Sequence, residues 1–132
     1  MIYLLDTNIV SMALRDASSS AATRMANHRP SELVIPSIVR AELTFGAVKG
    51  GSATRIHNLR TFLAQFPNLD FDSSCLDIYS TTRHTLERAG QGIGAMDLLI
   101  ASIALAHKLI IVTNNTSEFS RIAGLHLEDW RI

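Results

Sequence analysis

Polar side chains that can bind a metal ion follow two short apolar runs of this sequence. Asp6 comes directly after the run Ile2–Leu5, and Thr113 comes directly after the run Leu109–Val112. Carboxylate, amide and hydroxyl oxygens suit hard divalent cations such as Mg²⁺ and Mn²⁺. The candidate residues are Asp6, Thr7 and Asn8 at the first place, and Thr113, Asn115 and Glu118 at the second.

Two further acids belong to segments with helical character. Asp97 opens the segment Met96–His107, which is apolar on nearly every side, so a helix here must lie in the interior with its N-terminus facing the protein. Glu42 lies within a second helical segment. Each acid also has an ordinary explanation: Asp6 can cap a helix, the helix dipole favours Asp97, and an isolated helical Glu is usually solvated.

Taken together, the three carboxylates predict chemistry that none of them predicts alone. A divalent ion held by carboxylates from separate elements lowers the pKa of a bound water and stabilises charge that develops on phosphorus. No histidine or cysteine cluster with ligand spacing, no nucleophile elbow and no Walker loop offers a competing centre. Asp6, Glu42 and Asp97 therefore predict a Mg²⁺-dependent centre for phosphodiester hydrolysis.

Short apolar runs that alternate with helical segments must position these acids. The runs Ile2–Leu5, Leu33–Ile35 and Leu109–Val112 are wholly apolar, which is typical of strands buried on both faces. The alternation predicts an α/β fold with a central parallel sheet and helices on both faces, and ligands of such sheets bind outside the carboxyl ends of the strands. Helices are expected after a Ser37 cap, from Ser52 until Pro67, from a Ser74 and Asp77 capping box until Gly90, and over Met96–His107.

The stretch GQGIGAM offers a different function, because Gly90, Gly92 and Ala95 fit the G-x-G-x-x-G/A pattern of a dinucleotide-binding loop. That pattern works only when a strand leads into the first glycine, and here a helical segment precedes it. We therefore expect Gly90 to end a helix and the loop after it to deliver Asp97 to the next one.

Composition limits the class of protein. The chain has 132 residues, 47% of them apolar, which predicts one domain over 1–132 with a sizeable core. No apolar run approaches the roughly 20 residues that span a bilayer, and no signal peptide is recognised, so we expect a cytoplasmic protein without membrane contact. The net charge is zero and Cys75 is the single cysteine, so neither bulk charge nor a disulfide indicates a function. Unassigned candidates for phosphate contacts are Arg15, Arg24, Arg40 and Arg83.

These motifs resemble the PIN domain ribonucleases and, among them, the VapC-type toxins of bacterial toxin–antitoxin pairs. The resemblance covers nearly the whole chain and rests on a combination of motifs, since any one of them alone is weak. The motifs are Leu4–Asn8, Arg40–Leu43 with Phe45–Gly46, Ile93–Gly94 with Asp97–Ala101, Ile111–Asn115 with Glu118–Phe119, and Gly124–Trp130.

The resemblance implies a single PIN-like domain and a role for each candidate residue. Asp6 and Asp97 would be the principal metal ligands, with Glu42 as a further ligand or a base that positions water. Thr7 and Asn8 would hold Asp6 and the substrate side of the pocket, and Thr113 would support the acids by hydrogen bonding. One departure is Asn115, which stands where many PIN domains have a fourth acid. Glu118 would compensate for the charge that Asn115 lacks.

The resemblance also implies partners. It implies a homodimer, a VapB-type antitoxin whose tail fills the active site, and an RNA substrate, often a tRNA such as initiator tRNA cut in the anticodon loop. Two alternatives stay open at this point. A site weakened by Asn115 would leave a non-catalytic RNA- or partner-binding module. A phosphatase or phosphoacceptor domain would use Asp6 as nucleophile, but the chain lacks an Asp two residues after Asp6.

Overall fold

A four-stranded parallel sheet forms the centre of the computed structural model, which describes all residues from 1 to 132. The sheet has the strand order β2-β1-β3-β4, and every neighbouring pair is parallel. The strands are β1 (Tyr3–Leu5), β2 (Leu33–Val34), β3 (Ile110–Val112) and β4 (Leu127–Glu128). The parallel sheet expected from the three apolar runs is confirmed, with β4 as an additional short edge strand.

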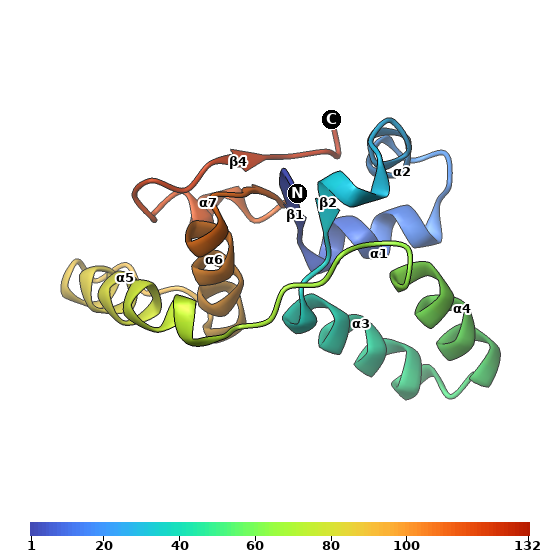
Figure 1. Ribbon diagram of the computed structural model, residues 1–132, viewed down its shortest axis with the longest axis horizontal. Helices are drawn as coiled ribbons and strands as arrows, with labels where there is room; N and C mark the ends of the chain where they lie inside the picture. Colours follow the sequence, from blue (N-terminus) through green and yellow to red (C-terminus); the bar gives the residue numbers. More distant parts are fainter.

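Seven α-helices connect and cover the strands (Figure 1). The connection from β1 to β2 runs in one direction along the sheet, and the connection from β2 to β3 runs in the other. Right-handed crossovers in opposite directions place their helices on opposite faces, as expected for this fold class. The helices are α1 (Thr7–Arg15), α2 (Ser20–Ala26), α3 (Ser37–Gly50), α4 (Ala53–Leu63), α5 (Leu76–Arg88), α6 (Ala95–His107) and α7 (Thr116–Phe119), with 3-10 turns at Pro30–Glu32 and Ser73–Cys75.

Helix α6 is the interior helix that its apolar composition predicts. Ile100, Ala101, Ile103 and Ala104 are fully buried in the single core cluster of the protein. The helix packs beside β3, which follows it directly in the chain. Its first turn therefore lies near the sheet, and this is the turn that carries Asp97.

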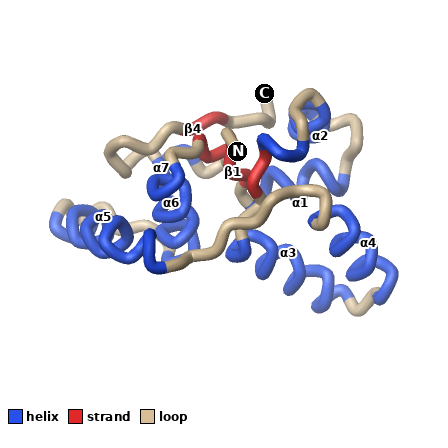
Figure 2. Tube along the Cα trace, viewed as in Figure 1, coloured by secondary structure: helices blue, strands red, loops and turns tan.

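The helices α3 and α4 form a hairpin that extends away from the sheet (Figures 1 and 2). Gly51 ends α3 with a left-handed backbone, at φ 74°, and Ser52 caps α4 by accepting a hydrogen bond from the amide of Arg55. The predicted stop and restart between these two helices are thus confirmed. None of the helices of the protein combines the length and the apolar character that crossing a membrane requires.

Two predicted helix caps are wrong. Ser37 is the first residue inside α3, because Pro36 takes the N-cap position and fixes the extended backbone there. Ser74 lies inside the 3-10 turn that precedes α5, and its amide and hydroxyl donate to the carboxylate of Asp72. Gly90 does end α5 as expected: it has φ 68°, and the amide of the next residue, Gln91, bonds back to the carbonyl of Leu86.

Arg40 has a structural function, so its assignment as a candidate phosphate contact is wrong. Its guanidinium donates to the carbonyls of Ile35 at 2.6 Å and Leu63 at 3.0 Å, and to the carbonyls of Phe66 and Pro67. These bonds use the fork of donors that distinguishes Arg from Lys. They tie the end of β2 to the end of α4 and to the loop that follows.

Two of the other candidate arginines also have partners within the protein. Arg24 bonds the carbonyl of Ile132 and pairs with Glu128. Arg83 pairs with Glu87 at 2.9 Å. Arg15, at the exposed end of α1, has neither an ion pair nor a side-chain hydrogen bond within the protein.

Candidate active site

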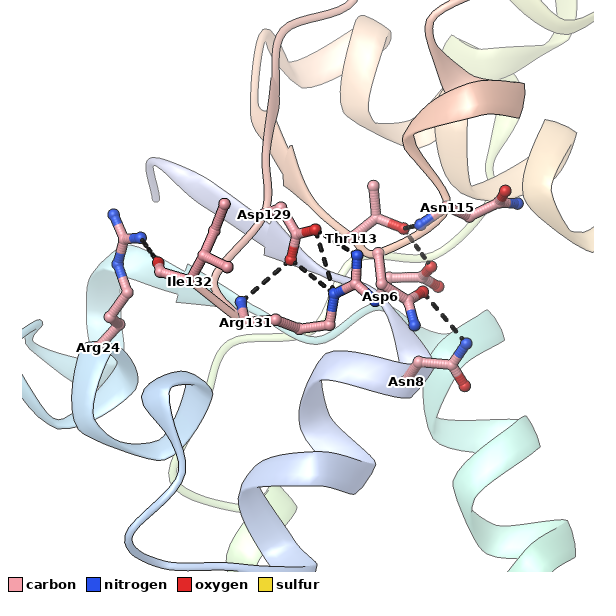
Figure 3. A network of polar contacts seen from close by, with 9 residues as sticks. Asp6, Asn8, Arg24, Thr113, Asn115, Asp129, Arg131 and Ile132 are labelled. Atoms are coloured by element: carbon pink, nitrogen blue, oxygen red, sulfur yellow. Dashed lines mark hydrogen bonds and ion pairs between the residues drawn. The ribbon is translucent and has the colours of Figure 1, made fainter.

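Asp6 lies at the point where β1 ends and α1 begins, and its carboxylate is held on both sides. The residue is only 6% exposed. Its Oδ1 accepts a hydrogen bond of 2.8 Å from the amide of Thr7, and its Oδ2 accepts one of 2.8 Å from the hydroxyl of Thr113 (Figure 3). The amide of Asp6 donates to the carbonyl of Val112. Asp6 is therefore both the N-cap of α1 and a fixed acid between the ends of β1 and β3.

Thr113 and Asn115 continue this network toward α6. The hydroxyl of Thr113 accepts a hydrogen bond of 2.9 Å from the amide of Asn115. The side-chain amide of Asn115 donates to Asp97 at 3.0 Å and to Glu118 at 2.6 Å. The NH₂ group of Asn115, and not its carbonyl oxygen, thus faces the two carboxylates in this structure.

Glu42 enters the site from α3. Its Oε1 accepts a hydrogen bond of 2.9 Å from the hydroxyl of Thr7. Asn8, which is exposed on the first turn of α1, donates to the side chain of Asn114 at 3.3 Å (Figure 3). The structure thereby brings residues from β1, α1, α3, α6 and the loop after β3 to one place.

Most of these side chains line one cavity of about 340 Å³ that contains no apolar residue, whereas Thr113 and Glu118 are bonded to lining residues but do not line it. Its volume lies at the lower end of the usual range for ligand sites. The lining includes three carboxylates and no Lys, Arg or His. The lining residues are Asp6, Thr7, Asn8, Glu42, Asp97, Asn114 and Asn115.

Burial and the closeness of the carboxylates to one another disfavour the ionisation of all the acids of the cavity at the same time. Burial raises the pKa of Asp6, against the lowering effect of its hydrogen bonds from Thr113 and Thr7. Partial burial, together with the nearby carboxylates of Glu118 and Asp6, raises the pKa of Asp97 to about 7. The hydrogen bond from Asn115 lowers the pKa of Glu118. A site of this kind is stabilised by a bound cation.

The chemistry of the donors fits a hard divalent cation. All the available ligand atoms are oxygens or amide groups, and no protein cation offsets the three carboxylates. No set of three or more Asp, Glu, His or Cys side chains is arranged to hold an ion directly. Mg²⁺ usually binds through one or two carboxylates and keeps several of its waters, so this spacing is compatible with it. The ligand set Asp6, Asp97 and Glu42 stays a prediction.

Asn114 belongs to the polar strand end that the sequence indicates, but the sequence assigns it no role of its own and does not indicate the bond that holds the loop before α6. Asn114 stands between Thr113 and Asn115, and its position two residues after the end of β3 is the signal that identifies it as a lining residue. The guanidinium of Arg121 donates to the carbonyl of Gly92 at 3.0 Å. This bond holds the loop that delivers Asp97 to α6, and nothing in the sequence pattern indicates it.

The family model described as the PIN domain matches residues 3–125 of the chain. Among curated proteins, the chain is 39% identical to Ribonuclease VapC2 of Rickettsia felis, over 98% of each chain. It is 35% identical to the tRNA(fMet)-specific endonuclease VapC of Shigella flexneri, over 97% of each. The chain therefore belongs to the PIN domain family and, within it, to the VapC ribonucleases.

Solved structures agree with this assignment. The crystal structure of VapBC2 from Rickettsia felis bound to a promoter DNA fragment matches with a TM-score of 0.87 and 38% identity, over 98% of this chain and 99% of that one. The structure of DNA-bound VapBC from Salmonella typhimurium matches with a TM-score of 0.89 and 30% identity, over 98% of each chain. The PIN fold and the family resemblance expected from the sequence are confirmed.

Proposed function

We propose that this chain is a Mg²⁺-dependent endoribonuclease that acts as the toxin of a toxin–antitoxin pair, with residues 1–132 forming one PIN domain. One observation carries the proposal. Three carboxylates from three different elements line a single polar cavity at the carboxyl ends of the strands, with no basic side chain among them. Such a cavity attracts a divalent cation and, through it, the phosphate of a substrate.

Each lining residue has a role in this proposal, and so do Thr113 and Glu118, which are bonded to lining residues. Asp6 and Asp97 hold the ion, and Glu42 either completes its coordination or orients the attacking water. When bound, Mg²⁺, or Mn²⁺ in its place, makes that water more acidic and stabilises the charge on the phosphate. Thr7 and Thr113 keep Asp6 in one orientation through the hydrogen bonds that they donate to it.

The amide side chains act on the substrate side. Asn8 and Asn114 both line the cavity, bond each other and offer further donors and acceptors to a ribose or phosphate. Asn115 orients Asp97 and Glu118 through its NH₂ group. Glu118 supplies the negative charge that Asn115 lacks. Asn115 and Glu118 are therefore positioning groups in the proposed site.

The proposed substrate is a tRNA, with initiator tRNA cut in the anticodon loop as the specific case. The name of the relative from Shigella flexneri, a tRNA(fMet)-specific endonuclease, supports this choice. The proposed partner is a VapB-type antitoxin, supported by the VapBC complexes among the similar structures. We also propose that the toxin forms a homodimer and acts in the cytoplasm, where such a substrate is found.

The test is cleavage of total bacterial tRNA by the purified chain with Mg²⁺ or Mn²⁺, with the product ends mapped. Controls with EDTA and with Asp97→Asn accompany it. We expect one metal-dependent cut in one tRNA, lost in both controls. Cleavage that persists in Asp97→Asn and in Asp6→Ala would overturn the proposed centre. Metal binding without cleavage of any RNA would favour the non-catalytic module.

A further inference from the structure

One face of α3 runs from the acidic cavity to the exposed tip of the α3 and α4 hairpin. Glu42 lies at the cavity end of this face. Residues three, four and seven positions further along an α-helix lie on the same side as the first. These are Phe45, Gly46 and Lys49, which with Glu42 we name the Glu42 face.

Phe45 is unusually exposed for an aromatic residue. Its side chain is 67% exposed, one turn beyond Glu42, and it makes no aromatic contact within the protein. The other large apolar residues of the hairpin pack against its interior or the core, apart from Val48. An exposed ring beside a candidate active site is available to stack on a ligand.

Gly46 has no structural reason to be glycine. It lies inside α3, where glycine destabilises a helix relative to alanine. A Cβ built at Gly46 would meet no atom within 4 Å, so packing inside the protein does not exclude a side chain there. Its backbone is not in the left-handed region either. The remaining physical reason is close approach of a molecule from outside the chain.

The charge of the hairpin indicates what kind of molecule approaches. Between Glu42 and Asp70 the sequence contains no Asp or Glu, but it contains Lys49, Arg55 and Arg60, all exposed. The guanidinium of Arg55 lies over the end of α3, since its Nη1 is 3.2 Å from the place where a Cβ of Gly50 would be. The whole chain has zero net charge, so this hairpin is a local positive region that suits a polyanion.

We propose that the Glu42 face binds an unpaired strand of the RNA substrate and guides it into the acidic cavity. This inference rests on the proposed function. Phe45 stacks on a base, Gly46 lets the strand approach the backbone of α3, and Lys49 and Arg55 contact phosphates. The strand is single, because only an unpaired base exposes a face on which an aromatic ring can stack.

The test measures RNA binding separately from cleavage. A fluorescein-labelled single-stranded oligoribonucleotide is titrated with the full chain carrying Asp97→Asn, and its anisotropy is followed. Adding Phe45→Ala should weaken binding roughly tenfold, which is a typical loss for one base stack. Adding Lys49→Gln should weaken binding and lower the slope of log K against log salt by about 1.

Gly46→Ala gives the sharpest result, because its two expected effects have opposite signs. Alanine should raise the melting temperature of the chain, since it favours the helix. It should nevertheless weaken RNA binding at least fivefold, and RNA cleavage in the otherwise unchanged chain should fall with it. A residue with only a structural role would gain stability without this loss.

Two matched controls lie elsewhere on the surface. Leu76→Ala removes an apolar side chain that is 53% exposed on α5, and Arg88→Gln removes an exposed charge at the end of the same helix. Both should leave RNA binding unchanged. Unchanged RNA binding in Phe45→Ala and Gly46→Ala would overturn the inference. The inference would be overturned in the same way if RNA binding were unchanged and these variants differed only in their inhibition by a protein partner. The proposed function would still stand if the unsubstituted chain cleaves RNA.

Discussion

Thr113 makes the side-chain hydrogen bond that fixes Asp6 at the ends of β1 and β3. Its hydroxyl is fully buried, donates to Asp6 and accepts from the amide of Asn115. Thr113→Val keeps the shape but leaves both partners without this bond. We expect the free energy of unfolding to fall by about 2 kcal/mol, in line with unpaired buried polar groups, as measured by urea denaturation.

Thr113→Ser provides the control for this prediction. It retains the hydroxyl and loses only a methyl group, so most of the stability should return. If Thr113→Val were as stable as the unsubstituted chain, the hydrogen bonds to Asp6 and Asn115 would contribute little, and the rigidity assigned to Asp6 would be wrong.

Asp97 gives a pH dependence of known sign. Its pKa is raised to about 7 by burial and by neighbouring carboxylates, so the folded state holds a proton more tightly than the unfolded chain does. In EDTA, the free energy of unfolding should therefore fall as pH rises from about 4 to about 7, and change no further from this cause above that.

Asp97→Asn removes this titration. The stability of this variant relative to the unsubstituted chain should increase by roughly 1–2 kcal/mol between pH 5 and pH 8, after allowance for solvent screening of a half-exposed group. Urea denaturation at the two pH values measures it. If the stability difference between Asp97→Asn and the unsubstituted chain were the same at both pH values, the pKa of Asp97 would not be raised in the folded protein.

The sequence predicts the two main acids of the site, Asp6 and Asp97, because it indicates where strands end and where helices begin. Asp6 follows an apolar run directly, and Asp97 opens a helix too apolar to lie at the surface. The orientation of Asn115 does not follow, because it depends on hydrogen bonds to side chains distant in the sequence. Its NH₂ group bonds Asp97, 18 positions earlier, as well as Glu118.

At the scale of elements, Arg40 locks α3 and α4 into their hairpin. It donates to four carbonyls, one just after β2, one at the end of α4 and two in the loop that follows α4. Arg40→Met should lower the free energy of unfolding by about 3 kcal/mol, because several partly buried carbonyls lose a charged donor. Arg15→Met, at an exposed position without a partner, should change it by less than about 0.5 kcal/mol.

Urea denaturation of these two variants measures the difference. Equal effects of the two substitutions would contradict the structural role of Arg40. This role also explains why the sequence misleads here, since an arginine beside a candidate catalytic acid has the same appearance whether it binds phosphate or backbone carbonyls.

Elements are predictable where one local signal dominates. The mostly apolar composition of α6 and the glycines that end α3 and α5 identify those helices. The predicted caps at Ser37 and Ser74 are wrong for two reasons: Pro36 takes the N-cap position of α3, and a 3-10 turn capped by Asp72 precedes α5, whose N-cap is Cys75. The strand β4 has only two residues, one of them Glu128, so it has no apolar pattern and is defined by pairing with β3.

At the scale of the whole molecule, the C-terminal segment closes the structure over the start of the chain. Trp130 is fully buried, stacks on His28 with ring centroids 5.2 Å apart, and contacts the ring of Tyr3. Arg24 lies over the Trp130 ring at 5.5 Å. Beyond Trp130, Arg131 pairs with Asp129 (Figure 3).

Trp130→Ala should therefore lower the free energy of unfolding by about 3–5 kcal/mol, as expected for a large buried aromatic residue. Deletion of Ile132, which is 89% exposed, should have little effect beyond the bond that its carbonyl accepts from Arg24. Thermal denaturation of the two variants tests this. If the C-terminal segment did not pack against the start of the chain, both variants would melt close to the temperature of the unsubstituted chain.

The central claim is that the polar cavity binds a catalytic divalent cation through Asp6 and Asp97. Calorimetric titration of the purified chain with Mn²⁺ at pH 8, where Asp97 is ionised, tests it most directly. We predict a saturable heat that is lost in Asp97→Asn and retained in the Arg88→Gln control. The same heat in Asp97→Asn and in Asp6→Asn, or no binding by the unsubstituted chain, would contradict the claim.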